Sequence, residues 1–225
     1  YLSDFPAESL SEIIKNFHNT IWRYENEFIP AVQADKADRA VNCGEEIKFV
    51  MHRREDCKKL VELIEKGELP LRVTHNDTKL NNVLFDSDSD DAICVIDLDT
   101  VMPGLALYDF GDSIRFGANS CAEDDDNYDK VELMLDYFEA YAKGFLSEAG
   151  DALNQCEIDN LAFSAKLMTF ECGMRFLTDY LNGDTYFKTA YPEHNLVRAK
   201  NQFALVADME RKMEQMQQII KNITE

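Results

Sequence analysis

The chain of 225 residues is strongly acidic, with 43 Asp and Glu against 23 Lys and Arg and a formal net charge of −20. Such a charge repels nucleic-acid phosphates and anionic lipid headgroups, so we expect neither nucleic acid nor a membrane as a partner. It also repels nucleotides, and a nucleotide site would therefore need Mg²⁺ or a local group of basic side chains. With 45% apolar residues, the sequence can form an ordinary hydrophobic core.

The six cysteines are scattered without a CxxC pair, which is typical of reduced core thiols. The sequence contains no apolar run of roughly 20 residues, the length a membrane helix needs. Its first residues also lack the basic and apolar order of a signal peptide. We therefore expect a cytoplasmic protein.

Two helices are predicted in the first third of the chain. Apolar residues recur at three- and four-residue spacing over residues 10–28, and Ser9 with Glu12 fits a capping box at the start. A second helix is expected over residues 45–66, where Gly67 ends it.

A β-hairpin follows, formed by residues 82–85 and 92–96 and joined by the acidic turn 86–91. After an irregular stretch and an acidic loop, the remainder is predicted to be helical. The irregular stretch covers residues 97–119, the acidic loop 123–126, and the helices lie near 128–147, 158–182 and 195–223. Without repeats or linkers, the sequence predicts one domain over residues 1–225, of α+β class, mostly α-helical with a small β-hairpin directly after residues 75–82.

The last predicted helix carries an apolar stripe from Val206 to Ile223 with heptad-like spacing. Two to three heptads are too few to indicate a coiled coil, and such a stripe more often packs within its own domain. The oligomeric state stays open.

Residues 75–82 have the H-x-D-x-x-x-x-N spacing of a kinase catalytic loop. Phosphoryl transfer needs a carboxylate that orients the attacking hydroxyl and accepts its proton, and Asp77 fits that role. The amide oxygen of Asn82 suits a Mg²⁺ ion beside the phosphates. We expect His75 to brace the loop through hydrogen bonds.

A second metal-binding carboxylate is expected at the end of a strand packed against this loop. Asp97 has that position, and Asp99 could add a ligand or a hydrogen bond to a ligand. The tripeptide Asp109-Phe110-Gly111 is similar to the metal-binding DFG sequence of protein kinases. It lies far beyond Asp77, however, and lacks a preceding apolar strand, so we assign the metal to Asp97.

The run HNDTKLNNVLFD, followed by VIDLDTVMPGLALYDFGDSIRFGA, resembles the aminoglycoside phosphotransferase and choline kinase superfamily, whose fold is protein-kinase-like. Within it, the sequence is most similar to N-acetylhexosamine 1-kinases and related phosphotransferases. The likeness continues through MTFECGMRFLTDYLNGDTYFK to HNLVRAKNQFALVADME. The resemblance implies phosphorylation of a sugar hydroxyl by ATP with Mg²⁺, with Asp77 as base and Asn82 and Asp97 as metal ligands.

In such sugar kinases the later segment also lines the acceptor pocket. Arg175 could form fork-like hydrogen bonds to sugar oxygens, and Tyr186 could offer a hydroxyl or a stacking face. An arginine there disfavours the cationic acceptors choline and aminoglycosides. The alternative is that Arg175 neutralises the carboxylate of Asp109 or Asp112. We interpret these two aspartates, together with Arg115, as a structural network below the site.

Members of this superfamily carry an N-terminal lobe with a phosphate-covering loop and a strand lysine. Here no glycine precedes Gly44 and no GxGxxG occurs. We therefore expect the chain to be a C-terminal lobe, with the nucleotide-binding N-terminal lobe as its partner and little activity alone. The expected reaction is phosphorylation of the anomeric hydroxyl of an N-acetylhexosamine. A kinase for another small alcohol or sugar, or a non-catalytic binding lobe, is the alternative.

Overall fold

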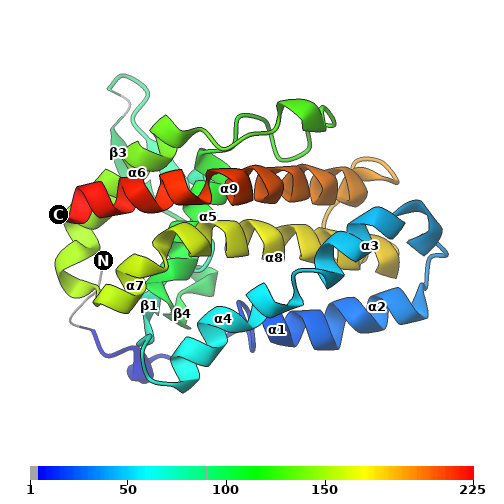
Figure 1. The fold of residues 1–225 in the computed structure, drawn as a ribbon, viewed down its shortest axis with the longest axis horizontal. Helices are drawn as coiled ribbons and strands as arrows, with labels where there is room; N and C mark the ends of the chain where they lie inside the picture. Colours follow the sequence, from blue (N-terminus) through cyan, green and yellow to red (C-terminus); the bar gives the residue numbers. More distant parts are fainter. Residues whose placement is uncertain (1–4, 90) are drawn as a thin grey trace.

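Two long helices, α8 (Leu161–Asn182) and α9 (His194–Thr224), form the centre of the fold. They run side by side in opposite directions (Figure 1), and α8 is buried along almost its whole length. Helix α5 (Ala106–Gly117) packs on α8, and α6 (Leu135–Ala149) packs on α9. The structure is a computed structural model that describes residues 5–89 and 91–225.

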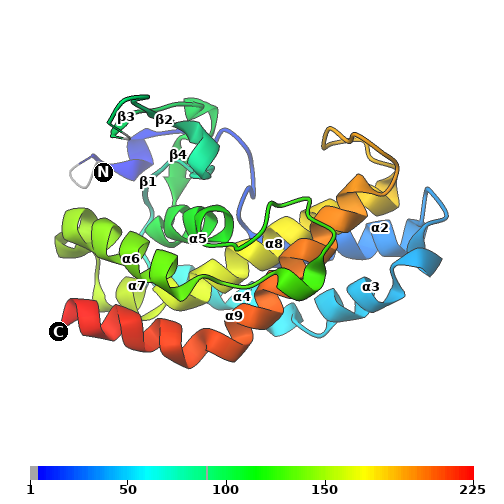
Figure 2. The same ribbon diagram turned by 90° about the horizontal axis from the view of Figure 1, so that it is seen from above.

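The N-terminal helices cover the other side of α8. They are α1 (Thr20–Arg23), a π-helical segment (Tyr24–Phe28), α2 (Ile29–Ala34), α3 (Gly44–Met51) and α4 (Arg54–Glu65). Helix α7 (Gln155–Asp159) precedes α8 and begins with a capping box formed by Asn154 and Glu157. Figure 2 shows the strands gathered at one end of the molecule and α2 and α3 at the other.

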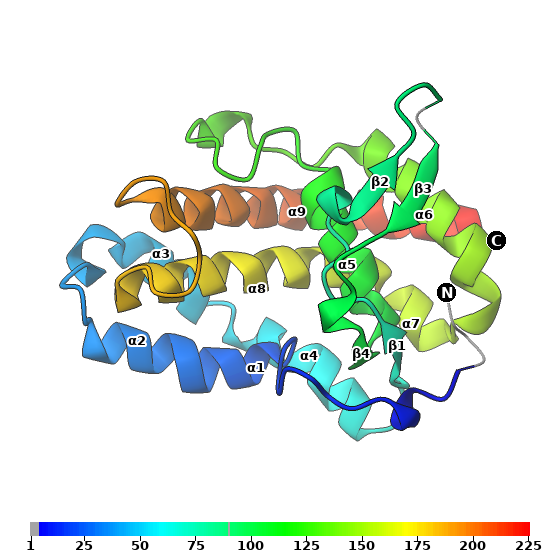
Figure 3. The same ribbon diagram turned by 180° about the vertical axis from the view of Figure 1, so that it is seen from behind.

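Four short strands form two antiparallel pairs beside α5 (Figure 3). Strand β1 (Arg72–Thr74) pairs with β4 (Met102–Gly104), with Val73 opposite Pro103. Strand β2 (Val83–Phe85) pairs with β3 (Ala92–Val95), with Val83 opposite Val95. The hairpin predicted over residues 82–96 thus forms, although Asp90 of its acidic turn lies outside the described residues.

The apolar stripe of α9 packs within the chain, as the sequence favours. Val206, Met209, Met216 and Ile220 are buried in the same hydrophobic cluster as residues of α5, α6 and α8. This stripe therefore faces the protein's own core.

The helix predicted over residues 10–28 is wrong in its first half. The helix begins only at Thr20, where the Asn19 side chain caps it by accepting from the Trp22 N–H at 3.0 Å. Asn16 has a φ of 57°, which is left-handed and breaks any helix, and Glu12 accepts a hydrogen bond from its N–H instead of capping at Ser9. Tertiary contacts of this segment outweigh its helical periodicity.

The single helix predicted over residues 45–66 is two helices, because the chain turns at His52 and Arg53. Helix α3 packs on α8 and α9, whereas α4 packs on α1. One straight helix could not reach both surfaces. The predicted stop is confirmed: α4 ends at Glu65, and Gly67 has a φ of 73°.

The stretch predicted as irregular, residues 97–119, contains β4 and the buried helix α5. The glycines of α5 make the helix hard to predict from the sequence, since glycine lowers helix propensity. Gly111 is required by packing: a Cβ there would lie 2.6 Å from the carbonyl oxygen of Ser164 on α8. The close approach of α5 to α8 explains a helix that propensity alone disfavours.

The six cysteines are free thiols, and four of them are not fully buried. Cys43 and Cys57 are core thiols as expected, and burial raises their pKa values to about 11 and about 12. Cys94 on β3 is exposed, contrary to that expectation. Within the described ranges, no helix combines the length and apolar character needed to cross a membrane.

Gly111→Ala should destabilise the protein, because its methyl group would press on the backbone of Ser164 and on Met168. We expect the free energy of unfolding to fall by about 1–3 kcal/mol. Gly144→Ala in α6 is the matched control, since nothing lies within 4 Å of its added Cβ. It should raise the free energy of unfolding by about 0.5–1 kcal/mol. Equal effects in urea titrations would contradict the packing argument.

Candidate active site

The predicted catalytic loop lies between β1 and β2 and turns at Asn76, whose φ is 65°. The buried Asn76 side chain holds the turn from both sides. Its amide nitrogen donates to the carbonyl oxygens of Thr74 (3.2 Å) and Thr100 (3.0 Å), and its oxygen accepts from the Thr74 hydroxyl (3.0 Å). Asparagine tolerates the left-handed region better than most residues, and these contacts stabilise it there.

Asp109 on α5 anchors the backbone of this turn. Its carboxylate accepts the N–H groups of His75 (2.9 Å) and Asn76 (2.7 Å), and its carbonyl accepts the Thr78 hydroxyl (2.6 Å). The residue is only half-buried, yet its carboxylate lies deep in protein. Burial raises its pKa to about 6, against the opposing effect of the two N–H groups. Both carboxylate oxygens of Asp109 thus accept hydrogen bonds from the loop backbone, as expected for a residue with a structural role.

Asp77 follows this turn and is about a quarter exposed. Its Oδ2 accepts hydrogen bonds from Lys79 Nζ (2.7 Å) and Asn82 Nδ2 (2.9 Å). Asn82 Nδ2 also donates to the Asp77 carbonyl at 2.8 Å. Within the described part of the chain, Asp77 Oδ1 accepts no hydrogen bond. This carboxylate is held by one oxygen and can accept from a ligand with the other.

His75 links the loop to the end of β3. Its Nε2 lies 3.0 Å from the carbonyl oxygen of Ile96, and its Nδ1 lies 3.3 Å from the N–H of Asp77. The carbonyl can only accept and the amide can only donate, so this geometry requires a neutral ring with its proton on Nε2. These two contacts have the form that the sequence analysis expects, in which His75 stabilises the loop through hydrogen bonds.

The three predicted metal ligands are oxygen donors near the end of the hairpin. Asn82 is tied to that end because its carbonyl accepts the Ile96 N–H at 2.9 Å. Asp97, at a φ of 62°, and Asp99 are both exposed. Within residues 5–89 and 91–225, the Asn82 amide oxygen and both carboxylates make no hydrogen bond or ion pair.

These free oxygens fit Mg²⁺, which commonly binds one or two carboxylates and completes its shell with phosphate oxygens and water. No cluster of three or more His, Cys, Asp and Glu side chains suited to a metal occurs in the part of the chain that the structure describes.

A cavity of about 470 Å³ opens beside Asp77. Arg175 on α8 and Tyr186 after it line the same cavity, so the structure brings together the predicted base and both predicted substrate residues. A second cavity of about 550 Å³ shares Phe17, Arg175, Tyr186 and Phe187 with the first. Asn82, Asp97 and Asp99 do not line either cavity.

Arg175 is surrounded by aromatic rings. Its Cζ lies 5.2 Å from the ring centroid of Phe17, 5.9 Å from that of Tyr186 and 5.6 Å from that of Phe187. In the described part of the chain it forms no ion pair, so the alternative that it neutralises Asp109 or Asp112 is wrong. Its guanidinium is available to a ligand.

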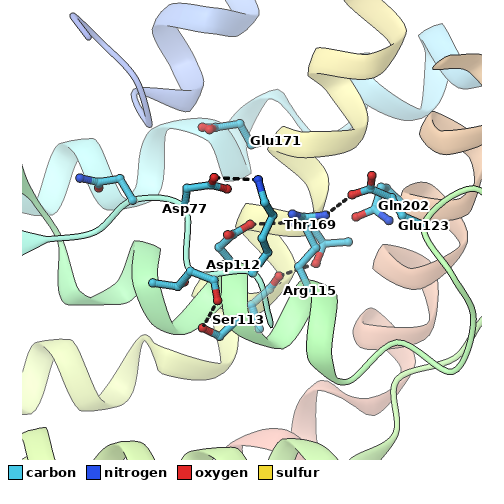
Figure 4. A network of polar contacts seen from close by, with 12 residues as sticks. Asp77, Asp112, Ser113, Arg115, Glu123, Thr169, Glu171 and Gln202 are labelled. Carbon is cyan, nitrogen blue, oxygen red and sulfur yellow. Dashed lines mark hydrogen bonds and ion pairs between the residues drawn. The ribbon is translucent and has the colours of Figure 1, made fainter. Parts of the chain in front are cut away.

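Asp112 pairs instead with Arg115 at 2.8 Å, and Arg115 reaches Glu123 at 2.5 Å. Figure 4 shows this chain of contacts beside Asp77. Burial lowers the pKa of Arg115, but the neighbouring Cys172, Asp112 and Glu123 hold it well above the ordinary value. The network beneath the site is thus as predicted, with Arg115 as its cation.

The sequence analysis missed Lys79, His18 and Glu171, which all line the cavity beside Asp77. Lys79 has a local signal, since it lies two residues after Asp77 in the loop. His18 and Glu171 have none, because they are distant in sequence from the loop and from each other.

Residues 12–144, more than half of the chain, match the phosphotransferase enzyme family. The chain belongs to this family. Its kinases are phosphotransferases acting on small molecules and generally use ATP and Mg²⁺. The match includes the loop around Asp77, the hairpin and α5, but it ends before Arg175 and Tyr186.

Asp109→Asn should change how turnover depends on pH. As pH falls through about 6, Asp109 gains a proton and one of its two N–H partners loses an acceptor. The turnover of the unmodified protein should decline there. In the variant, one amide N–H faces a backbone N–H at every pH, so we expect roughly tenfold lower kcat at pH 8, about 1.4 kcal/mol, and no decline near pH 6.

The effect on stability has the opposite sign. The pKa of Asp109 is raised above its ordinary 3.8, so the protonated form contributes stability below about pH 4 that is lost as pH rises through 6. Asp151→Asn, at an exposed residue, is the control for both measurements. An acid decline of kcat that persists in Asp109→Asn would exclude Asp109 as its source.

Proposed function

We propose that this chain is the C-terminal, catalytic lobe of an ATP-dependent kinase that phosphorylates a hydroxyl group of a small molecule. The observation that carries this proposal is that, among the residues the structure describes, Asp77 Oδ1 accepts no hydrogen bond and Arg175, which lines the cavity beside it, forms no ion pair. The preferred acceptor is the anomeric hydroxyl of an N-acetylhexosamine.

Asp77 is the proposed base. Lys79 and Asn82 hold its Oδ2, so the carboxylate keeps its orientation while Oδ1 accepts the hydrogen of the acceptor hydroxyl. As the hydroxyl oxygen forms its bond to phosphorus, its proton passes to Asp77 and the bond to the leaving nucleotide oxygen breaks.

Lys79 has a second proposed role, because it lines the same cavity as Asp77. Its ammonium can offset charge on the phosphoryl group during transfer. Asn82, Asp97 and Asp99 would hold Mg²⁺, which when bound supplies neutralisation of the ATP phosphates.

The exposed apolar side chains of the hairpin support a nucleotide-covering partner. Six of them are between 36% and 63% exposed: Leu84, Phe85, Ile93, Val95, Ile96 and Leu98. Patches of this kind mark binding surfaces. Since they adjoin Asn82 and Asp97, we propose that the adenine base and a β-rich N-terminal lobe bearing a strand lysine cover them.

The proposed acceptor is neutral because of Arg175. Its guanidinium, which forms no ion pair with any described residue, repels choline and aminoglycosides, whereas it can donate two hydrogen bonds to sugar oxygens. Phe17, Tyr186 and Phe187 offer ring faces beside it. Another small alcohol or sugar remains the second candidate, and a non-catalytic binding lobe the third.

Asp77→Asn should abolish turnover and spare the fold, since asparagine keeps the shape but cannot take the proton. We expect kcat of the full-length protein to fall roughly 10²–10⁴-fold, with an unchanged melting temperature. Asp88→Asn in the exposed hairpin turn should have no effect. Unmodified turnover in Asp77→Asn would refute the assigned base.

Arg175→Met should weaken acceptor binding. Loss of two charged hydrogen bonds should raise the acceptor KM roughly 10–100-fold, about 1.4–3 kcal/mol, with the KM for ATP unchanged. Arg211→Met, at an exposed arginine of α9, is the control. A coupled assay over N-acetylhexosamines, hexoses, choline and an aminoglycoside identifies the acceptor class. Faster turnover of a cationic acceptor than of any sugar would overturn the assignment.

A further inference from the structure

His18 lies directly behind the catalytic loop, between the loop and α8. Its Nε2 is 2.9 Å from the carbonyl oxygen of Asn76, and its Nδ1 is 2.7 Å from Oε1 of Glu171. Only 5% of the His18 side chain and 1% of the Glu171 side chain are exposed. Both contacts are therefore largely shielded from water.

The hydrogen-bonding partners determine how many protons His18 and Glu171 must hold between them. The Asn76 carbonyl can only accept, so His18 Nε2 must bear a hydrogen. The contact to Glu171 needs one more hydrogen, either on His18 Nδ1 or on the carboxyl group. The pair thus holds two protons, as imidazolium with carboxylate or as imidazole with carboxylic acid.

The surroundings of Glu171 favour imidazolium with carboxylate. Burial by itself raises the pKa of Glu171, but the charge and hydrogen bond of His18, with Arg23 and Thr20, bring it below the ordinary value. The Thr20 hydroxyl donates to Oε2 at 2.5 Å, and Arg23 Nε lies 4.0 Å from Oε1. Both oxygens of the carboxylate are therefore met by donors.

Other titratable groups approach the pair from each neighbouring element. They are Tyr108 and Asp109 on α5, Arg23 on α1, Cys57 on α4, and Asp77 and Arg175 across the cavity. Tyr108 and Cys57 have raised pKa values because of burial, so both are neutral near pH 7. Glu171 is the carboxylate in direct contact with His18.

We propose that His18 and Glu171 are a positioning pair whose shared proton holds the Asn76 carbonyl, and through it Asp77, in the arrangement that transfers phosphate. This rests on the proposed function. Removal of the proton leaves a nitrogen lone pair facing either the Asn76 carbonyl or a buried carboxylate, and both arrangements are repulsive. The loop should therefore lose its arrangement, and the enzyme its turnover, at alkaline pH.

Glu171→Gln separates the effect of the shared proton from the effect of side-chain packing, because the two side chains have nearly the same shape. The glutamine amide N–H can donate to His18 Nδ1, and its oxygen can still accept from Thr20. A neutral His18 then keeps its Nε2–H on the Asn76 carbonyl. We expect the alkaline decline of kcat, measured against the variant's own value at neutral pH, to disappear or to move at least one pH unit upward.

His18→Leu removes the donor to Asn76 altogether. It should lower kcat more than tenfold at every pH, with a smaller change in acceptor KM. His194→Gln is the matched control, because His194 is also buried beside a carboxylate, Asp124, but contacts no residue of the loop. Its pH profile should equal that of the unmodified protein. An alkaline decline unchanged in Glu171→Gln would overturn the proposal.

Nuclear magnetic resonance tests the pair without any kinase assay. In ¹⁵N-labelled full-length protein, His18 should carry a hydrogen on Nε2 and share a second hydrogen with Glu171 through Nδ1, with the ring signals assigned by their absence in His18→Leu. The backbone amides of residues 75–77 should shift together as this proton is lost, and should not do so in Glu171→Gln. A His18 ring without a hydrogen on Nε2 would refute the pair. These signals report on the pair even if every acceptor tested proves inactive, so failure of the two proposals can be told apart.

Discussion

The peptide group at Asn76 is the constraint on which the candidate active site depends. Its N–H donates to Asp109, its carbonyl accepts from His18, and its side chain is held between Thr74 and Thr100. A left-handed residue other than glycine costs about 1–3 kcal/mol and persists only where several contacts maintain it. Here the contacts come from β1, α5 and the segment before α1, so much of the fold serves to direct Asp77 toward the cavity.

Basic side chains gather at the cavity beside Asp77 although the chain as a whole is strongly acidic. Five basic side chains line the cavity beside Asp77: Lys79, Arg115, Arg175, Lys188 and Arg198. The charge of some of them is neutralised by ion pairs, that of Lys79 with Asp77 and that of Arg115 with Asp112 and Glu123. Arg175 is not balanced in the described part of the chain. A local group of basic residues, which, with Mg²⁺ as the alternative, composition requires of any nucleotide site, is thus present at this cavity.

Sequence reasoning succeeded where the information is local. The loop from His75 to Asn82 and the hairpin after it are defined by residues within about twenty positions, and both occur where predicted. It failed where distant contacts decide the conformation. Residues 10–19 have helical periodicity, but Asn16 is left-handed and His18 is bound to α8 and the loop. Helix α5 was missed because it contains glycines, of which Gly111 is required by the packing of α5 on α8.

The two histidines of the site show why local patterns reach only part of its chemistry. His75 must be neutral, because it accepts from one backbone group and donates to another, whereas His18 faces two acceptors and must share two protons with Glu171. The role of His75 is readable from its spacing to Asp77. The proposed role of His18 cannot be predicted in this way, because it depends on the contact with Glu171, which comes from the distant helix α8. Because both rings contact the same three-residue turn, its geometry depends on where each ring carries its hydrogens, and for His18 a residue far away in sequence helps to determine this.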